Sequence, residues 1–413
     1  MKSGDGLIVR IKPRVGDLQM DTLIALAGAA RRYGNGQIDL TRRANLQLRG
    51  VTHETLSPLL LCLTDRGLLD ANDEAEAVRN ILVSPLAGSD PSELLDVRPL
   101  ALELARLLET DGSLWRLPAK FAFLVDGGGA LPLDAERADI RLRAIAAEEE
   151  ARIAVGIDRP DRTLWLGATT PEAAPAAAVH VAHALLENLP ADGRVRLLDL
   201  AESDVEKIRA AVSGIVDPLE APPLLRVRTS PVGLLKDGAY VFAAGIAVPF
   251  GRVESDTLRA LAEALGAAGV VELRLSPWRA LYVPLRHGIP AHSVLRAAAA
   301  LGLIVDDKNP LLKVTACAGA PACCSATTDT RGDARLLAEA LEAFPEIRSV
   351  HVSGCPKGCA RSEPADLVLV ARGNGYGLVR NGTASDPPER SIASAEISAF
   401  SLLSQLRRAP RHA

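Results

Sequence analysis

The sequence predicts an α+β fold in which a half unit occurs twice, each copy followed by an α/β domain. The chain has 413 residues, of which 48% are apolar and 24% charged. This is an ordinary globular composition, but the chain is too long for a single hydrophobic core. An ungapped internal repeat with an offset of 235 residues divides it. In both copies, strand-like alternation of apolar residues is combined with helix-like spacing of three to four. We therefore expect two half units related by a pseudo-twofold axis.

Matches of specific residue types carry the repeat. Asp21-Thr22-Leu23 matches Asp256-Thr257-Leu258, and Gly16, Gly34 and Gly67 match Gly251, Gly269 and Gly302. Glycines and an Asp-Thr-Leu triplet in one register are hard to obtain by chance, even in a chain rich in alanine and leucine. Each copy is predicted to form a strand, a helix, an alternating strand segment (38–48 or 273–283) and a second helix.

The patterns between and after the repeats give the domain boundaries. We predict a ferredoxin-like half domain at 1–75, an α/β domain at 76–205, a connector at 206–235, a second half domain at 236–306 and an iron–sulfur-binding α/β domain at 307–400. In the first α/β domain we expect a strand at 120–125 and a long Ala-rich helix near 171–188. The connector is assigned because prolines cluster there.

Charge and apolar patterning exclude several classes of protein. The net charge of −4 and 3% aromatic content argue against a nucleic-acid binder. No apolar run reaches the ~18–20 residues of a membrane helix, and the first residues show no secretory signal. We therefore expect a cytoplasmic monomer without membrane or nucleic-acid partners.

Five of the six cysteines lie within 43 residues, which in a reducing compartment indicates metal or redox chemistry rather than disulfides. Cys317 and Cys323 have five residues between them, and Cys355 and Cys359 have three. Four thiolates from two loops suit a [4Fe–4S] cluster. Structural zinc is the alternative, although its cysteine pairs are usually spaced more closely. Cys324 could replace Cys323 as a ligand. Cys62 lies in an apolar helical segment and is assigned to core packing.

The cysteine pattern behind a duplicated half unit resembles the nitrite/sulfite reductase superfamily, over nearly the whole chain. Leu40-Thr41-Arg42-Arg43-Ala44-Asn45-Leu46-Gln47 is similar to that family's tetrapyrrole strand, Val78-Arg79-Asn80-Ile81 to its Arg-Asn-Val element, and Leu117-Pro118-Ala119-Lys120-Phe121 to its Leu-Pro-Arg-Lys-Phe-Lys strand. The resemblance implies ferredoxin-like half domains around a pseudo-twofold axis, and a [4Fe–4S] cluster beside a bound tetrapyrrole.

Other residues resemble one shorter branch of that family, the precorrin-3B synthases. These are Leu273-Arg274-Leu275-Ser276-Pro277-Trp278-Arg279 and Ser353-Gly354-Cys355-Pro356-Lys357-Gly358-Cys359-Ala360. Ala122 stands where sulfite reductases carry a second lysine that holds the oxyanion. The resemblance implies O2-dependent monooxygenation of precorrin-3A at C20, with γ-lactone formation, in aerobic cobalamin biosynthesis. It also implies a non-haem iron besides the cluster. The alternatives are a sirohaem-dependent sulfite or nitrite reductase and a non-catalytic tetrapyrrole or cluster carrier.

A tetrapyrrole with many acetate and propionate groups needs cations in its cleft. The residues that fall on the matched elements are Arg42, Arg43, Arg79, Lys120, Arg279 and Lys357. Trp278 could stack on the macrocycle or fill the repeat interface. No residue can be assigned to catalysis. His180 and His183 have a spacing that allows chelation, but an Ala-rich helix face without metal is the simpler interpretation.

Monooxygenation needs two electrons besides O2, and the sequence shows no Gly-x-Gly-x-x-Gly after a strand. The glycine-rich segments at 126–129 and 373–377 are predicted to form turns. We therefore expect an external donor, a reductase or a ferredoxin using NAD(P)H.

Overall fold

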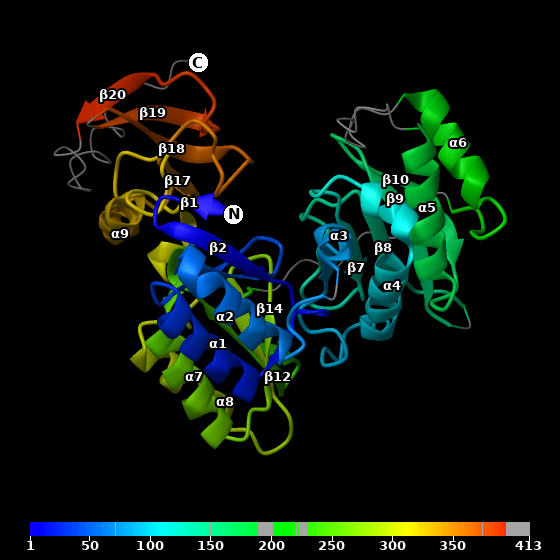
Figure 1. Ribbon diagram of the computed structural model, residues 1–413, viewed down its shortest axis with the longest axis horizontal. Coiled ribbons are helices and arrows are strands. Elements are labelled where there is room, and N and C mark those ends of the chain that lie inside the picture. The colour runs from blue at the N-terminus through cyan, green and yellow to red at the C-terminus, as the bar shows by residue number, and fades with distance from the viewer. Residues whose placement is uncertain are drawn as a thin grey trace.

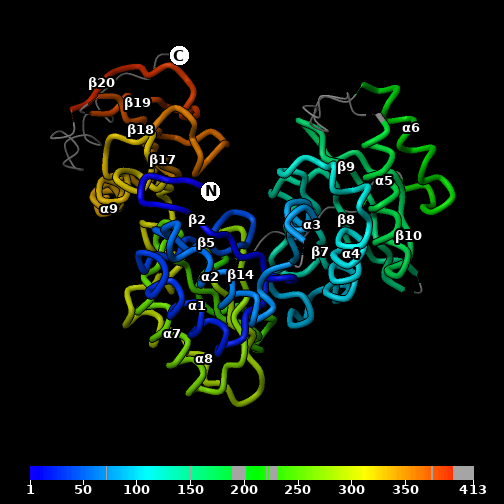
Figure 2. The backbone as a smooth tube through the Cα atoms, in the orientation of Figure 1, coloured from blue at the N-terminus to red at the C-terminus, as the bar shows by residue number. Residues whose placement is uncertain are grey.

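The computed structural model describes residues 1–70, 72–148, 150–188, 201–219, 222, 230–373 and 375–393. Its strands form four five-stranded sheets within this part of the chain. The two half domains build one body together, and the two α/β regions project from it as separate lobes (Figures 1 and 2). The predicted fold class, an α+β fold with a duplicated half domain, is confirmed. We call residues 72–219 the first lobe and residues 307–393 the cysteine lobe.

The half domains have equivalent elements. The first contains β1 (Lys2–Ser3), β2 (Gly6–Ile11), β3 (Asp17–Gln19), α1 (Met20–Tyr33), β4 (Gln37–Leu40), β5 (Leu46–Val51) and α2 (His53–Thr64). The second contains β11 (Gly233–Asp237), β12 (Tyr240–Ala247), η3 (Pro249–Gly251), β13 (Arg252–Glu254), α7 (Ser255–Ala267), β14 (Glu272–Leu275), β15 (Ala280–Pro284) and α8 (Ala291–Ala300). The bounds of β3 and β4 differ from those of β13 and β14 by the 235 residues of the sequence repeat.

The alternating segment predicted at 38–48 is two strands, not one. A tight turn separates β4 from β5, because the Thr41 hydroxyl accepts hydrogen bonds from the backbone N–H groups of Arg43 and Asn45. Ala44 in this turn has a left-handed φ of 52°. Side-chain acceptance of this kind is a local signal of a turn. The alternation of apolar residues continues through the turn and conceals it.

Each half domain gives one strand to the sheet of the other. The sheet orders are β1-β2-β5-β4-β13 and β11-β12-β15-β14-β3, so β13 completes the first sheet and β3 completes the second. Apolar side chains of α1 and α7 pack into one core with both sheets; they include Leu23, Leu26, Leu258, Leu261 and Leu265. The two copies are therefore a single folding unit with one shared core.

Opposite charges face each other at both exchanged strands. Arg252 of β13 lies opposite Asp39 of β4, and Arg274 of β14 lies opposite Asp17 of β3. Arg252 and Asp17 are repeat-equivalent, as are Asp39 and Arg274, so the two pairs have reversed polarity. If each strand paired within its own half, Asp17 would face Asp39 and Arg252 would face Arg274. Like charges directly across a sheet are destabilising, so the charge pattern favours exchange.

Asp39 connects more than the two half domains. It accepts two hydrogen bonds from Arg252, at 2.6 and 2.8 Å, and one from Arg49 at 3.2 Å. Arg331 of the cysteine lobe lies 3.5 Å away. Burial by itself would raise the pKa of Asp39. The hydrogen bonds from Arg252 and the positive charges of Arg331, Arg252 and Arg49 together lower it by more, so the net shift of the Asp39 pKa is downward. Asp39 is therefore a buried anion shared by both half domains and the cysteine lobe.

The first lobe has the sheet order β10-β9-β8-β7-β6, in which β6, β7 and β8 are parallel. Its elements are α3 (Asp73–Val78), β6 (Ile81–Val83), α4 (Arg98–Thr110), η1 (Gly112–Arg116), β7 (Phe123–Asp126), β8 (Ile140–Ile145), β9 (Arg152–Asp158), β10 (Thr163–Thr169), α5 (Ala174–Asn188) and α6 (Glu202–Val212). The strand predicted from Lys120 begins at Phe123.

The connector predicted at 206–235 begins inside a helix. Helix α6 packs Val205, Ile208 and Val212 into the core of the first lobe. Asp217 then forms a bridge with Ala168 at the end of β10. The first lobe therefore extends past residue 205, because burial of these apolar side chains outweighs the local proline signal. Much of the rest of the connector lies outside the described residues.

The cysteine lobe has a sheet in chain order, β16 (Val314–Ala316), β17 (Val350–Ser353), β18 (Ala365–Arg372), β19 (Gly375–Gly382) and β20 (Arg390–Ala393). The first three strands are parallel and the others antiparallel. Helix α9 (Thr330–Ala340), η4 (Pro310–Lys313) and η5 (Leu341–Ala343) complete it. The hairpin predicted around Gly373 joins β18 to β19. Residues 394–400 of the predicted domain lie outside the described residues.

Loss of the shared anion should destabilise the whole chain. Asp39→Ala leaves Arg49, Arg252 and Arg331 without their common counter-ion, so we expect the free energy of unfolding to fall by about 3–5 kcal/mol in urea denaturation. Asp256→Asn is the control, since its ion pair with Arg31 also joins the half domains but is exposed. That change should cost under ~1 kcal/mol. Equal losses in both variants would contradict a special role for Asp39.

Candidate functional site

The cysteines lie on two loops that leave the same edge of one sheet. Cys317 follows β16 and Cys355 follows β17, and these strands are parallel neighbours with Ala316 opposite Val352. The backbone N–H of Gly354 donates to the Cys317 Sγ at 3.1 Å, so the two loops touch. Parallel pairing thus brings together cysteines that are 31 residues or more apart in sequence.

The loop contacts leave no room for larger residues. A Cβ at Gly354 would lie 2.5 Å from the Ala326 Cβ and 3.3 Å from the Cys317 Sγ. The Thr330 hydroxyl, at the start of α9, donates to the Cys317 carbonyl at 2.9 Å and lies 3.8 Å from its Sγ. A thiolate at Cys317 would therefore receive one backbone hydrogen bond and lie beside a hydroxyl group.

Four of the six thiols are linked by their electrostatic effect on the pKa of one of them, Cys359. Burial raises the pKa of Cys359, and the neighbouring Cys355, Cys317 and Cys323 raise it further. Cys324 is exposed, as is Cys359, and it is not among the largest influences on the pKa of Cys359. Cys62 is half-buried on α2, against the half-domain core. Thiols that oppose one another's ionisation are expected where thiolates would share a metal cluster, because bound metal supplies the compensating charge. The donor set thus fits a [4Fe–4S] cluster.

Among the described residues, cysteines included, no group of three or more His, Cys, Asp or Glu side chains is arranged to hold a single metal ion. His183 instead hydrogen-bonds Asp111 at 2.8 Å, and His180 bonds the Ala176 carbonyl at 2.7 Å. The described residues therefore offer no ligand set for the non-haem iron that the resemblance implies.

The first half domain supports the first cysteine loop. Arg49 and Ser3 both donate to the Ala322 carbonyl at 2.7 Å. Arg49 is buried, and Asp5 and Asp39 hold its guanidinium. A buried arginine saturated by carboxylates positions its neighbours, so Arg49 fixes this loop.

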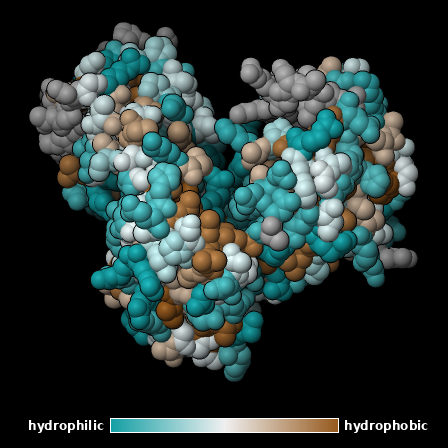
Figure 3. Space-filling view, viewed as in Figure 1, coloured by the Kyte–Doolittle hydropathy of each residue, from teal (hydrophilic) through white to brown (hydrophobic). Residues whose placement is uncertain are grey.

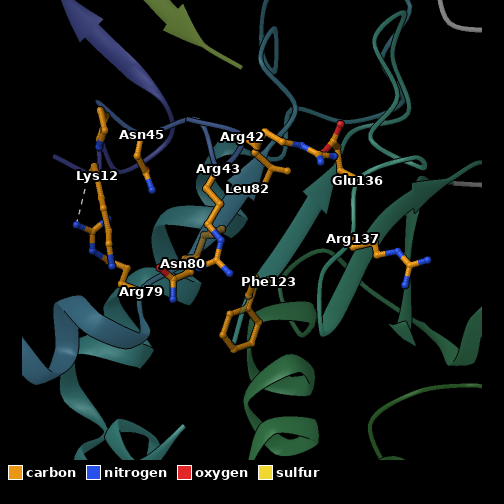
Figure 4. A pocket seen from close by; sticks show the side chains of 13 residues that line it. Lys12, Arg42, Arg43, Asn45, Arg79, Asn80, Leu82, Phe123, Glu136 and Arg137 are labelled. Carbon is orange, nitrogen blue, oxygen red and sulfur yellow. Dashed lines mark hydrogen bonds and ion pairs between the residues drawn. The ribbon is translucent and has the colours of Figure 1, made fainter. Parts of the chain in front are cut away.

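A basic cavity lies where the β4–β5 turn meets the first lobe (Figure 4). Its lining residues are Lys12, Pro13, Arg42, Arg43, Asn45, Arg79, Asn80, Ile81, Leu82, Ala122, Phe123, Glu136 and Arg137. The surface is also hollowed between the first lobe and the cysteine lobe (Figure 3). The cavity combines cations with the half-buried apolar residues Ile81 and Leu82, which is the character expected of a site for a carboxylated apolar ligand.

The predicted substrate-binding arginines differ in whether a carboxylate of the protein itself already pairs with them. Arg79 is buried and pairs with Asp70 at 2.8 Å, so it ties the cavity wall together. Arg42 pairs with Glu363 at 3.0 Å and with Glu136 at 3.6 Å. Arg43 donates to the Lys120 carbonyl at 2.9 Å, and burial lowers its pKa, as does the charge of Arg10. Of these three predicted residues, Arg43 makes a backbone contact while the other two already face carboxylates.

The other predicted residues lie elsewhere. The Lys120 side chain is exposed and outside the cavity lining. Arg279, in a left-handed conformation with φ of 58°, donates to the Ala360 carbonyl beside Cys359 at 3.3 Å. Lys357 is exposed on the second cysteine loop and donates to Ser325 at 3.3 Å. Trp278 packs edge-on against Tyr282 at 6.3 Å, in an apolar cluster between the second half domain and the first lobe. Trp278 therefore packs between the second half domain and the first lobe, and not at the interface between the two repeats.

Sequence reasoning missed two cations of the cavity, Lys12 and Arg137. Lys12 follows β2 directly and is 7% exposed. Its Nζ donates to the Glu76 carbonyl and lies 4.0 Å from that residue's carboxylate. Burial, opposed by Glu76 and reinforced by Arg79 and Arg10, lowers its pKa to about 8. The only sequence signal was a lysine directly after an apolar strand. Nothing in the local sequence distinguishes such a buried lysine from a solvent-exposed one.

His351 is a buried histidine below the second cysteine loop. It lies on β17, and neither ring nitrogen has a hydrogen-bond partner among the described residues. Burial lowers its pKa to about 4, and the nearby Arg361 and Arg279 contribute. The imidazole is therefore neutral at physiological pH. It places a polar side chain beneath the second cysteine loop.

Comparison with known families identifies the fold. A model described as the nitrite/sulfite reductase ferredoxin-like half domain matches residues 1–63 and 234–301. One described as the nitrite and sulphite reductase 4Fe-4S domain matches residues 74–247. A structure titled "Structure of Mycobacterium tuberculosis NirA protein" superposes with a TM-score of 0.76 at 20% identity, over 98% of this chain and 82% of that one. The chain belongs to the nitrite/sulfite reductase family.

Within this family of oxidoreductases, the curated relatives include more than one activity. A precorrin-3B synthase from Sinorhizobium sp. is 35% identical over 94% of this chain and 82% of the relative. A ferredoxin–nitrite reductase from Synechococcus elongatus is 30% identical over 88% of this chain and 76% of the relative. The resemblance to precorrin-3B synthase is thus confirmed, and the family description supports an iron–sulfur cluster. The range matched by the 4Fe-4S model ends before Cys317. No helix among the described residues is long and apolar enough to span a membrane.

The pKa of Lys12 has a measurable consequence for stability. Because this pKa is lower in the folded protein than the ordinary 10.5, the unfolded chain binds more protons between about pH 8 and pH 10.5. The wild type should therefore gain stability relative to Lys12→Met as pH rises through this window in urea denaturation. Lys12→Arg stays charged throughout, so its difference from Lys12→Met should remain flat. A flat difference for the wild type would show that Lys12 is solvated.

Proposed function

We propose that this protein acts as a precorrin-3B synthase, hydroxylating precorrin-3A at C20 with O2 and closing a γ-lactone. The supporting observation is the basic cavity walled by Ala122, in a chain 35% identical to a curated precorrin-3B synthase. By the family resemblance, a sulfite reductase would carry an oxyanion-binding lysine at that position. A cavity rich in arginine with a non-ionic residue there suits a carboxylated macrocycle better than a small oxyanion.

The substrate's acetate and propionate groups would contact the cations of the cavity. Arg43 and Lys12 are the best placed, because Arg43 donates to a backbone carbonyl and the Glu76 carboxylate lies no closer than 4.0 Å to Lys12. Arg137, which is exposed at the rim, donates to the Pro160 carbonyl at 3.2 Å. Arg79 would act indirectly, because Asp70 holds its guanidinium. Ile81 and Leu82, which are half-buried, would contact the apolar part of the ring.

Cys317, Cys323, Cys355 and Cys359 would hold the cluster, which supplies one-electron transfer when bound. The Gly354 N–H would donate to the Cys317 thiolate, and Arg279 would position Ala360 beside Cys359. Hydrogen bonds and nearby positive charge raise the reduction potential of such a cluster. These residues would thus make the site easier to reduce.

The reaction balances only with an external reductant. One oxygen atom enters the substrate and the other leaves as water, which consumes two electrons and two protons. We propose that a separate reductase or ferredoxin, itself reduced by NAD(P)H, delivers these electrons in the cytoplasm. The non-haem iron of the resemblance would belong to the oxygen-activating step.

The direct test is turnover. Protein purified anaerobically with its cluster, given precorrin-3A, O2 and an electron donor, should form a product heavier by one oxygen atom in mass spectrometry. With ¹⁸O2 the label should appear in the product. If precorrin-3A is unchanged while the cluster is intact, the proposal is wrong. Soret and red-region absorption bands in the purified protein would instead favour the sirohaem reductase that the nitrite reductase relative suggests.

Cysteine variants test the ligand assignment. Cys355→Ser and Cys359→Ser should abolish the EPR signal of the reduced cluster, and Cys323→Ser should do the same. Cys324→Ser is the matched control because it changes a neighbouring exposed thiol, so at least ~80% of the iron and sulfide should remain. Loss of the cluster in Cys324→Ser but not in Cys323→Ser would exchange the two assignments. Zinc without sulfide in the wild type would exclude the cluster.

A further inference from the structure

Arg42 contacts two carboxylates that come from different lobes. Its Nη1 and Nη2 donate to the two carboxylate oxygens of Glu363, both at 3.0 Å. Its Nη2 also lies 3.6 Å from the Glu136 carboxylate. Glu363 follows the second cysteine loop, and Glu136 follows β7 of the first lobe. One guanidinium in the β4–β5 turn therefore joins the first half domain to both lobes, beside the basic cavity (Figure 4).

The charge balance at Arg42 is opposite to that of the cavity it lines. One cation faces two carboxylates, so this group carries a net negative charge at the edge of an otherwise cationic site. Burial raises the pKa of Glu363, but its hydrogen bonds, chiefly from Arg42, lower it to about 2, so it is ionised at all physiological pH values. A ligand carboxylate that approaches Arg42 meets an ionised competitor.

The two competitors differ in how easily they can leave. The side chain of Glu363 is 44% exposed, whereas that of Glu136 is 12% exposed. An exposed ion pair contributes little net stability, because water solvates both partners well once they separate. Glu363 can therefore turn into solvent once a second carboxylate takes over its two hydrogen bonds to Arg42. Glu136 has little solvent to turn into, so leaving Arg42 would strand a buried carboxylate without a counter-ion, and Glu136 stays beside Arg42.

We propose that Glu363 is a specificity-determining residue that occupies Arg42 until a carboxylate of the ligand replaces it. The ligand class is a macrocycle carrying several carboxylates, and this inference rests on the proposed function. A ligand already bound by Arg43 and Lys12 presents a further carboxylate at high local concentration, so it displaces Glu363. A ligand with one carboxylate does not gain enough. Displacement also releases the ion pair between the cysteine lobe and the β4–β5 turn.

Binding of a polycarboxylate probe to the full chain tests this exchange. The probe is uroporphyrin, whose side chains are all acetate and propionate, titrated by its Soret absorption at fixed ionic strength. Glu363→Gln removes the competing charge and should tighten binding about fivefold. Arg42→Gln should weaken binding about tenfold, because it removes the charge-assisted hydrogen bonds. The double variant should match Arg42→Gln, since Glu363 acts only through Arg42.

The control variant is Glu389→Gln. Glu389 also pairs with an arginine of the cysteine lobe, Arg380 at 3.4 Å, and has a similar exposure of 51%, but it does not line the cavity. Its affinity for the probe should equal that of the wild type. A monocarboxylate porphyrin does not displace Glu363 from Arg42, so the wild type, Glu389→Gln and Arg42→Gln should bind it with equal affinity.

The outcomes separate the two proposals. If wild-type protein binds uroporphyrin but Glu363→Gln binds it no better, or more weakly, then Glu363 is a structural partner of Arg42 and the exchange is wrong. If neither wild type nor Glu363→Gln binds any carboxylated tetrapyrrole, the proposed function fails first. Hydrogen exchange gives an independent readout: the backbone amides of residues 361–363 and 365 should exchange faster when uroporphyrin saturates the wild type, and a decrease would contradict displacement.

Discussion

The buried carboxylate of Asp39 is the constraint on which the arrangement of this protein depends. It lies in the first half domain, pairs with Arg252 on the strand received from the second half, and lies beside Arg331 of the cysteine lobe. Arg49 pairs with it from below and reaches on to the Ala322 carbonyl in the first cysteine loop. A buried ion with several partners tolerates no rearrangement that leaves one of them unpaired, so it fixes three parts of the chain together.

The strand exchange extends this constraint across the pseudo-twofold axis. The two exchanged positions carry reversed charges, Arg252 opposite Asp39 and Asp17 opposite Arg274. If the repeat-equivalent positions carried the same charges in both halves, each half could have paired its own two strands without placing like charges opposite each other. The duplication has therefore become asymmetric at these positions, and the same asymmetry continues into the site. The cysteine loops directly follow the second copy and have no counterpart after the first. The β4–β5 turn with Arg42 and Arg43 belongs to the first copy.

Partners, rather than positions, distinguish the cations around the cavity. Arg79 and Lys12 are neighbours, yet Asp70 neutralises the first while burial lowers the pKa of the second. The sequence could indicate that Arg42, Arg43 and Arg79 approach one cleft, because they fall on matched segments. It could not indicate which of them would meet a carboxylate, since Asp70, Glu136 and Glu363 are brought in from separate elements. Lys12 was overlooked for the same reason: its burial by α3 is a long-range contact.

The sequence by itself determined the duplication, the fold class and the clustering of cysteines late in the chain, because residue spacing and apolar period are local properties that survive in a one-dimensional pattern. It also indicated the hairpin at Gly373, where the glycines are the signal. The tertiary structure alone decided which half receives each strand, where the first lobe ends, and which arginines are already paired. Those outcomes depend on burial and on charges that meet only after folding, and neither leaves a trace in local spacing.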